Sequence, residues 1–139
     1  MLLSLSLLGA AQATVFVSHL DLDEIADRAD QVVIGEVSEV TSRRAPGGIV
    51  TEITVDVFDT LLGTPATELT LTLPGGRVSG ETLTVSGVPH LQVGHDLLLF
   101  LEDSRPVSFT QGIFFTDGEY AYGPEQAPVA MEEVRRTVR

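Results

Sequence analysis

Histidines are the residues with which this chain could bind a metal ion or transfer a proton near neutral pH. There are three of them, His19, His90 and His95, and no cysteine occurs anywhere in the sequence. His90 and His95 share one segment, but their spacing is uninformative and no cysteine ligand accompanies them. The lack of cysteine also excludes disulfides and a cysteine nucleophile. We therefore predict no metal site and no bound cofactor.

A catalytic triad could be assembled from Ser86, His90 and Asp96. No nucleophile-elbow motif surrounds Ser86, however, and the acid could be any of the 20 Asp and Glu residues. We therefore predict that the protein is not an enzyme, and we keep a hydrolase that uses His90 as an alternative.

The segment from Arg77 to Gly94 is the best candidate for a binding element. It follows the turn at residues 74–76 and precedes a short apolar run, which makes it a long loop between two strands. Long loops between the strands of small barrels commonly contact ligands. The binding residues that we predict there are Arg77, Glu81, Val88, His90 and His95.

Aromatic residues gather in the last third of the chain and could form a stacking platform for bases. Alternating aromatics in a hairpin more commonly fill a barrel interior or pair across strands, and this is the arrangement that we predict. The residues concerned are Phe100, Phe109, Phe114, Phe115, Tyr120 and Tyr122.

Composition and charge narrow both the fold and the partners. The apolar share of 43% excludes a disordered chain, and 13 Gly and 7 Pro favour strands joined by tight turns over a helical bundle. The formal net charge of −12 gives a surface that repels phosphate backbones and anionic headgroups. We therefore predict no nucleic-acid partner, and a protein or glycan as the partner.

The first thirteen residues have the pattern of an export signal. Met1–Ala13 reads MLLSLSLLGAAQA and ends in a small-x-small triplet, so cleavage is predicted before Thr14. The run is shorter than the roughly twenty apolar residues that span a bilayer. Its n-region carries no Lys or Arg, so either the true start lies upstream of Met1 or the α-amino group supplies the only positive charge. The alternative is a buried N-terminal element; the prediction that we adopt is an extracytoplasmic protein, periplasmic or secreted, without stable membrane insertion.

Period-two patterns predict about six strands. The first is kinked at Gly35 and ends before a polar turn over Arg43–Gly48, and the clearest is Ile49–Val57. Leu97–Leu101 is predicted to be a central strand, and Asp117-Gly118 the two-residue turn of a last hairpin. The remaining strands are Leu69–Leu73 and the arms of that hairpin, Gly112–Thr116 and Glu119–Tyr122.

Two short helices are predicted to flank the strands. The first covers residues 21–29, with Asp21 as N-cap and Glu24 as its capping-box partner. The second covers residues 128–138, with acidic residues early and arginines late. Residues 14–139 are thus predicted to form one all-β domain with short flanking helices, a small OB-like barrel of five to six strands. An immunoglobulin-like sandwich is the alternative.

Several strings of the chain resemble a large, poorly characterised set of exported bacterial domains with an OB-like β-barrel. They are residues 29–37 (ADQVVIGEV), 51–58 (TEITVDVF), 60–63 (TLLG), 74–76 (PGG), 85–89 (VSGVP), 93–101 (VGHDLLLFL) and 111–112 (QG). The first half is more weakly similar to netrin-like domains and tissue inhibitors of metalloproteinases. Those inhibitors chelate the zinc of their target through an N-terminal cysteine, which this chain lacks, so the resemblance implies only the barrel.

The function that we predict from these observations is an exported, non-catalytic binding module. It would contact its partner through one barrel face and the Arg77–Gly94 segment. The alternative from the netrin-like resemblance is a secreted protease inhibitor that uses a barrel loop or its new N-terminus.

Overall fold

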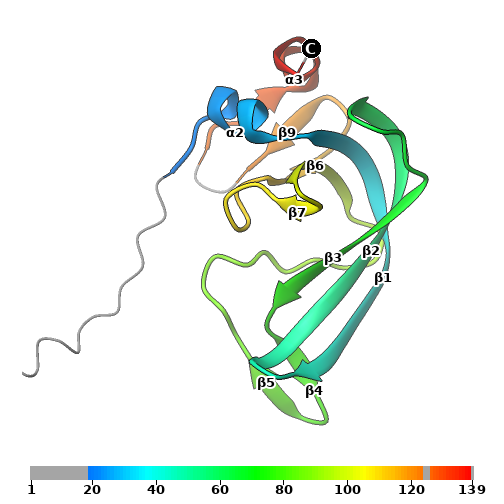
Figure 1. The fold of residues 1–139 in the computed structure, drawn as a ribbon, viewed down its shortest axis with the longest axis vertical. Coiled ribbons are helices and arrows are strands. Elements are labelled where there is room, and N and C mark those ends of the chain that lie inside the picture. Colours follow the sequence, from blue (N-terminus) through cyan, green and yellow to red (C-terminus); the bar gives the residue numbers. More distant parts are fainter. Residues whose placement is uncertain (1–18, 124–125, 139) are drawn as a thin grey trace, which may run out of the picture.

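The structure is a computed structural model that describes residues 19–123 and 126–138 (Figure 1). The predicted leader, residues 1–13, lies outside this range. Within it, no helix has both the length and the apolar character that crossing a bilayer requires.

The described chain is mostly β, with two short helices, so the predicted fold class is confirmed. One eight-stranded antiparallel sheet has the order β10-β9-β8-β6-β1-β2-β3, and β7 pairs with β6 beside this path. Its strands are β1 (Gln31–Ala45), β2 (Gly48–Leu62), β3 (Glu68–Pro74), β6 (Asp96–Glu102), β7 (Arg105–Pro106), β8 (Ile113–Thr116), β9 (Tyr120–Tyr122) and β10 (Val129–Ala130).

The sheet differs from the predicted barrel in strand number and in closure. No pairing between described residues joins its two edge strands, β3 and β10, so the sheet is strongly curved but not closed (Figure 1). The extra strands β7 and β10 have two residues each, too few to produce a period-two pattern. One large sheet also differs from the two packed sheets of the immunoglobulin-like alternative.

The β1–β2 hairpin is longer than its sequence pattern indicates. The predicted turn over Arg43–Gly48 is wrong, because pairing continues to Ala45 and Gly48 and leaves only two residues in the turn. The side chains at this exposed end are polar, so the sequence shows no period-two pattern there. Arg43, for example, forms an ion pair with Glu52 on the neighbouring strand. The register shifts between Ile34 and Gly35, at the predicted kink. A Cβ on Gly35 would lie 2.3 Å from the Asp56 carbonyl oxygen, so the two backbones can approach this closely only at a glycine.

Two hydrophobic clusters lie on opposite faces of the central strands β1 and β6. Successive side chains of a strand point to opposite faces, so Val32 and Phe100 join one cluster while Val33 and Leu99 join the other. All five residues of Leu97–Leu101 are buried, which agrees with the predicted central strand. We call the cluster that contains Phe100 the capped half and the cluster that contains Leu99 the open half.

Two helices cover the capped half (Figure 1). Helix α2 (Leu22–Arg28) begins with the predicted capping box: the Asp21 carboxylate accepts from the Glu24 amide, and the Glu24 carboxylate accepts from the Asp21 amide. Helix α3 (Met131–Thr137) buries Met131 and Val134. It begins three residues later than predicted, because Val129 and Ala130 pair with β9 as strand β10.

Two predicted turns also need correction. The Arg77–Gly94 segment is not entirely a loop, because β4 (Gly76–Val78) and β5 (Glu81–Leu83) form a small separate hairpin. In the last hairpin, β8 ends at Thr116 and β9 begins at Tyr120, so the connection contains residues 117–119 rather than two residues. The Asp117 carboxylate accepts hydrogen bonds from the Glu119 and Tyr120 amides and thereby stabilises the longer turn.

Candidate functional site

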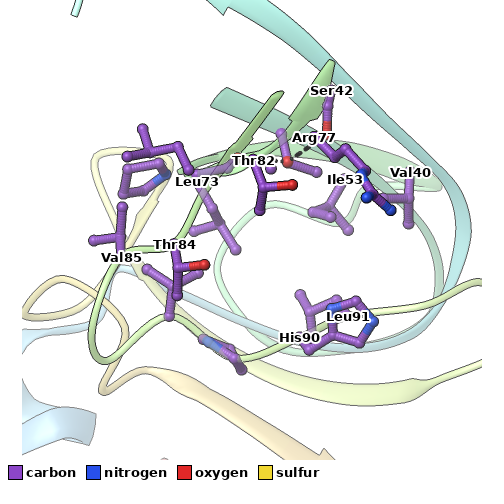
Figure 2. A pocket seen from close by; sticks show the side chains of 17 residues that line it. Val40, Ser42, Ile53, Leu73, Arg77, Thr82, Thr84, Val85, His90 and Leu91 are labelled. Carbon is purple, nitrogen blue, oxygen red and sulfur yellow. Dashed lines mark hydrogen bonds between the residues drawn. The ribbon is translucent and has the colours of Figure 1, made fainter. Parts of the chain in front are cut away.

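A cavity lies beside the β4–β5 hairpin. This hairpin is at the end of the molecule away from the helices (Figure 1). The cavity has a volume of about 460 Å³ and lies between the far end of β1–β2–β3, the β4–β5 hairpin and residues 84–91. We call it the hollow; Figure 2 shows the side chains that line it. Its volume falls within the roughly 300–1,000 Å³ typical of small-molecule sites.

The hollow exists because the sheet loses a strand at this point. Pairing of β1 with β6 ends at Glu36 and Asp96, and pairing of β1 with β2 continues to Ala45. The last backbone contacts on the β6 side join Val37 to Gly94 and His95. We call the far end of β1, β2 and β3, beyond these contacts, the ribbon. Its inner face is covered by a connecting segment instead of a strand.

The lining of the hollow is mainly aliphatic. Val40 on β1 and Ile53 on β2 are cross-strand partners, and Leu73 lies on the neighbouring strand β3. Cross-strand neighbours on one face lie side by side, so these three form a continuous apolar surface. Val85, Val88 and Leu91 line the hollow from the connecting segment.

Two hydroxyl groups in the lining are bonded to each other. The Thr51 hydroxyl donates to the Gly75 carbonyl over 2.7 Å and lies 2.8 Å from the Ser42 hydroxyl. A hydroxyl has one hydrogen, and that of Thr51 is used on Gly75, so Ser42 donates to Thr51. Both donors are therefore used within the protein.

Glycine is required where β4 crosses this hydroxyl pair. Gly76 has a φ of +140°, and a Cβ there would lie 2.4 Å from the Thr51 hydroxyl oxygen and 2.5 Å from that of Ser42. No side chain fits without moving the strand or the hydroxyls. The Pro74-Gly75-Gly76 string therefore brings the β4–β5 hairpin against the ribbon as well as ending β3.

One buried threonine, in the turn between β7 and β8, forms a hydrogen bond to residues 84–91. Thr110 is 5% exposed, and its hydroxyl donates to the Gly87 carbonyl over 2.7 Å. Val88 and Pro89, which follow Gly87, line the hollow and also a second cavity of about 380 Å³ on their other side. This two-residue piece is thus a partition whose position depends on Thr110.

The second cavity is more aromatic and is lined in part by Phe115 and Tyr122. The Tyr122 hydroxyl donates to the Asp117 carboxylate over 2.9 Å. Hydrogen bonds from the Tyr120 and Glu119 amides and from Tyr122 lower the pKa of Asp117, and the bond to Asp117 raises the pKa of Tyr122. The aromatic prediction holds for Phe100 and Phe114, which are buried edge to face, and for Phe115 and Tyr122, which are cross-strand partners, whereas Phe109 and Tyr120 are 45% exposed.

Of the five predicted binding residues, three line the hollow and two have other contacts. Arg77, Val88 and His90 belong to the lining. Glu81 forms an ion pair with Arg44. His95 packs edge on against Phe115, with ring centroids 5.1 Å apart, and its Nδ1 accepts from the Gln92 amide.

Among the described residues, Ser86, His90 and Asp96, from which a triad could be assembled, share no hydrogen bond. His90 Nε2 lies 3.1 Å from the side-chain nitrogen of Gln92, and in the described part of the chain it bonds neither Ser86 nor Asp96. Across residues 19–123 and 126–138, no group of three His, Cys, Asp or Glu side chains is placed to hold a metal ion.

Sequence reasoning missed the ribbon side of the hollow. Val40, Ile53 and Leu73 have the pattern of ordinary core residues, and nothing in that pattern shows that the opposite wall is a loop. One signal was present: Thr51 is a hydroxyl residue on the otherwise aliphatic face of Ile49–Val57. Its position matches the hydroxyl pair of the lining.

Compared with known proteins, the chain matches no family model and no curated protein. The resemblance to exported bacterial domains and the weaker one to netrin-like barrels therefore stay predictions.

Proposed function

We propose that the protein is an exported, non-catalytic binding module whose ligand occupies the hollow. The observation that carries the proposal is a cavity of about 460 Å³ with mainly aliphatic walls, in which the hydroxyls of Ser42 and Thr51 are bonded internally. A lining of this kind gains free energy when apolar surface of a ligand displaces water, by roughly 25 cal/mol for each Å² buried.

Val40 offers a direct test because it lines the hollow and is 36% exposed, so it can be enlarged without disturbing the core. Titration of the full chain with the neutral apolar dye Nile red should give saturable fluorescence. Val40→Phe should weaken dye binding at least about tenfold, the equivalent of 1.4 kcal/mol.

Val93→Phe is the matched control, because Val93 is 64% exposed and lies outside the lining. It should bind the dye as the unchanged protein does. Circular dichroism should show the same β content in all three proteins. No saturable binding by the unchanged protein, or equal effects of the two variants, would contradict the proposal.

Export is a separate part of the proposal and rests on the Met1–Ala13 string. Expression in a bacterium should deliver the chain to the extracytoplasmic fraction with Thr14 as its N-terminal residue, as read by mass spectrometry. Ala13→Asp should block cleavage because signal peptidase requires a small residue there. Retention of the uncleaved chain in the cytoplasm would contradict the proposed export.

A further inference from the structure

We infer that the ligand of the hollow is an aliphatic chain that ends in a carboxylate, and that Arg77 binds the carboxylate. This inference rests on the proposed binding function and adds the chemical class of the ligand. The proposed ligand is a single-chain fatty acid. Three observations support it: which of the described arginines lack a carboxylate partner, how the hydroxyls of Ser42 and Thr51 are bonded, and which side chains form the walls.

The first observation concerns the arginines. Among the described residues, Arg28, Arg43, Arg44, Arg135 and Arg136 each have a carboxylate within 4.0 Å. Arg77 and Arg105 have none in the same residues, although the chain carries 20 acidic side chains. Of these two arginines, only Arg77 lines the hollow.

Two acidic residues at this end of the molecule, Glu81 and Glu52, already have arginine partners. Glu81 on β5 binds Arg44, and Glu52 on β2 binds Arg43. The Arg77 guanidinium is thus a positive group on the rim of an aliphatic cavity and is free to form a charge-assisted, bidentate contact with an incoming carboxylate.

The hydroxyl groups of Ser42 and Thr51 offer no hydrogen-bond donor to a ligand on the ribbon side of the hollow. Their hydrogens are both used within the protein, so they cannot donate to a ligand. A peptide or a glycan would bring several hydrogen-bond acceptors against this surface, and each one left without a partner costs about 1–3 kcal/mol. A hydrocarbon chain brings none.

The test compares two ligands that differ only in the head group, decanoate and decan-1-ol, by isothermal titration calorimetry with the full chain at low ionic strength. The unchanged protein should bind decanoate at least about threefold more tightly, the ratio expected for one exposed ion pair. Because salt screens exposed charges, this preference should shrink at 0.5 M NaCl. This comparison of low and high salt uses the unchanged protein, so it does not depend on how a variant folds.

Arg77→Gln should abolish the preference for decanoate and leave the affinity for decan-1-ol unchanged. Arg105→Gln is the matched control, since it removes the same charge from the other unpaired arginine. It should keep the preference. Equal binding of the two ligands by the unchanged protein, or a preference that survives in Arg77→Gln, would overturn the inference.

Two further outcomes have fixed meanings. If neither decanoate nor decan-1-ol binds, the proposed function fails together with this inference. If decan-1-ol binds as tightly as decanoate, the binding function stands and only the assignment of the carboxylate is wrong. The remaining alternative occupant is an apolar peptide. It is tested with a leucine-rich hexapeptide that has a free carboxyl terminus, beside its amidated form. If this peptide binds more tightly than decanoate and its binding depends on Arg77, the inference is also overturned.

Discussion

The capped half and the open half share the central strands β1 and β6 but complete their interiors in different ways. In the capped half, α2 and α3 cover the sheet, and large side chains such as Phe100 and Phe114 fill the space between. In the open half, β1 and β2 continue past the end of β6, and a connecting segment lies where a strand would otherwise pair. Regular elements on both sides give a filled core, whereas a regular element opposite a loop leaves a cavity.

This comparison predicts its largest effect at the centre of the capped half. Phe100 is fully buried and packs edge to face on Phe114, so Phe100→Ala should lower the free energy of unfolding by about 3–5 kcal/mol. Urea denaturation measures this loss. Phe58→Ala, at a side chain that is 61% exposed, should change it by less than about 0.5 kcal/mol. Similar losses in both variants would mean that the capped half is not tightly packed.

The next largest effect is expected where β4 meets the ribbon in the open half. Gly76→Ala places a Cβ 2.4 Å from the Thr51 hydroxyl oxygen at a φ of +140°, and it should cost about 1–3 kcal/mol. Nile red binding should weaken too, because the hairpin forms part of the hollow. Gly47→Ala is the control: a Cβ there meets nothing within 4 Å. A stable Gly76→Ala variant with unchanged dye binding would show that the hollow does not depend on how the β4–β5 hairpin packs against the ribbon.

A smaller effect should follow from loosening the partition between the two cavities. Thr110→Val keeps the shape of the side chain but leaves the Gly87 carbonyl without its donor, at a cost of about 1 kcal/mol. Hydrogen exchange should accelerate at the amides of Gly87 and Val88 while β6 stays protected. Thr41→Val, at an exposed hydroxyl, should leave these rates unchanged. Unchanged exchange in Thr110→Val would show that other contacts fix the partition.

The smallest predicted effect concerns pH and the β8–β9 turn. The pKa of Asp117 is lowered in the folded protein from 3.8, so its contribution is present above the unfolded pKa and is lost as pH falls through the folded pKa. Acid should therefore loosen this turn. A carbon-13 titration of the Asp117 carboxyl should give a midpoint below 3.8, and Asp117→Asn should remove the pH dependence of exchange at the Tyr120 amide. A midpoint at or above 3.8 would contradict the bonding described for this turn.

Sequence patterns located the capped half better than the open half, for a physical reason. Asp21 with Glu24 and the run Leu97–Leu101 are local signals, since each reflects contacts or burial within a few residues. The hollow depends on the point at which β6 stops pairing with β1, and that is set by residues about 60 positions apart in the chain. Period-two patterns describe a face of one strand and not what lies opposite it.

The same limit applies to individual site residues. The sequence predicts Arg77, Val88 and His90 because they lie on a long connection between strands, and these three line the hollow, whereas Val40 and Ile53 cannot be told apart from core residues in the sequence. Glu81 and His95 lie on the same connection but contact Arg44 and Phe115. Which side of a segment faces a cavity depends on tertiary packing, and one sequence does not reveal it.

The alternation of side chains along β1 and β6 has a consequence for unfolding. Val32 and Val33 are neighbours in the chain but belong to different clusters, as do Leu99 and Phe100. Unfolding either half would expose one face of both strands to water, including side chains that are buried in the folded protein. Neither half can therefore stay folded alone without a large cost in free energy. We therefore expect the two halves to melt in a single cooperative transition, with the slowest-exchanging amides in β1 and β6 reporting the global stability of the whole domain.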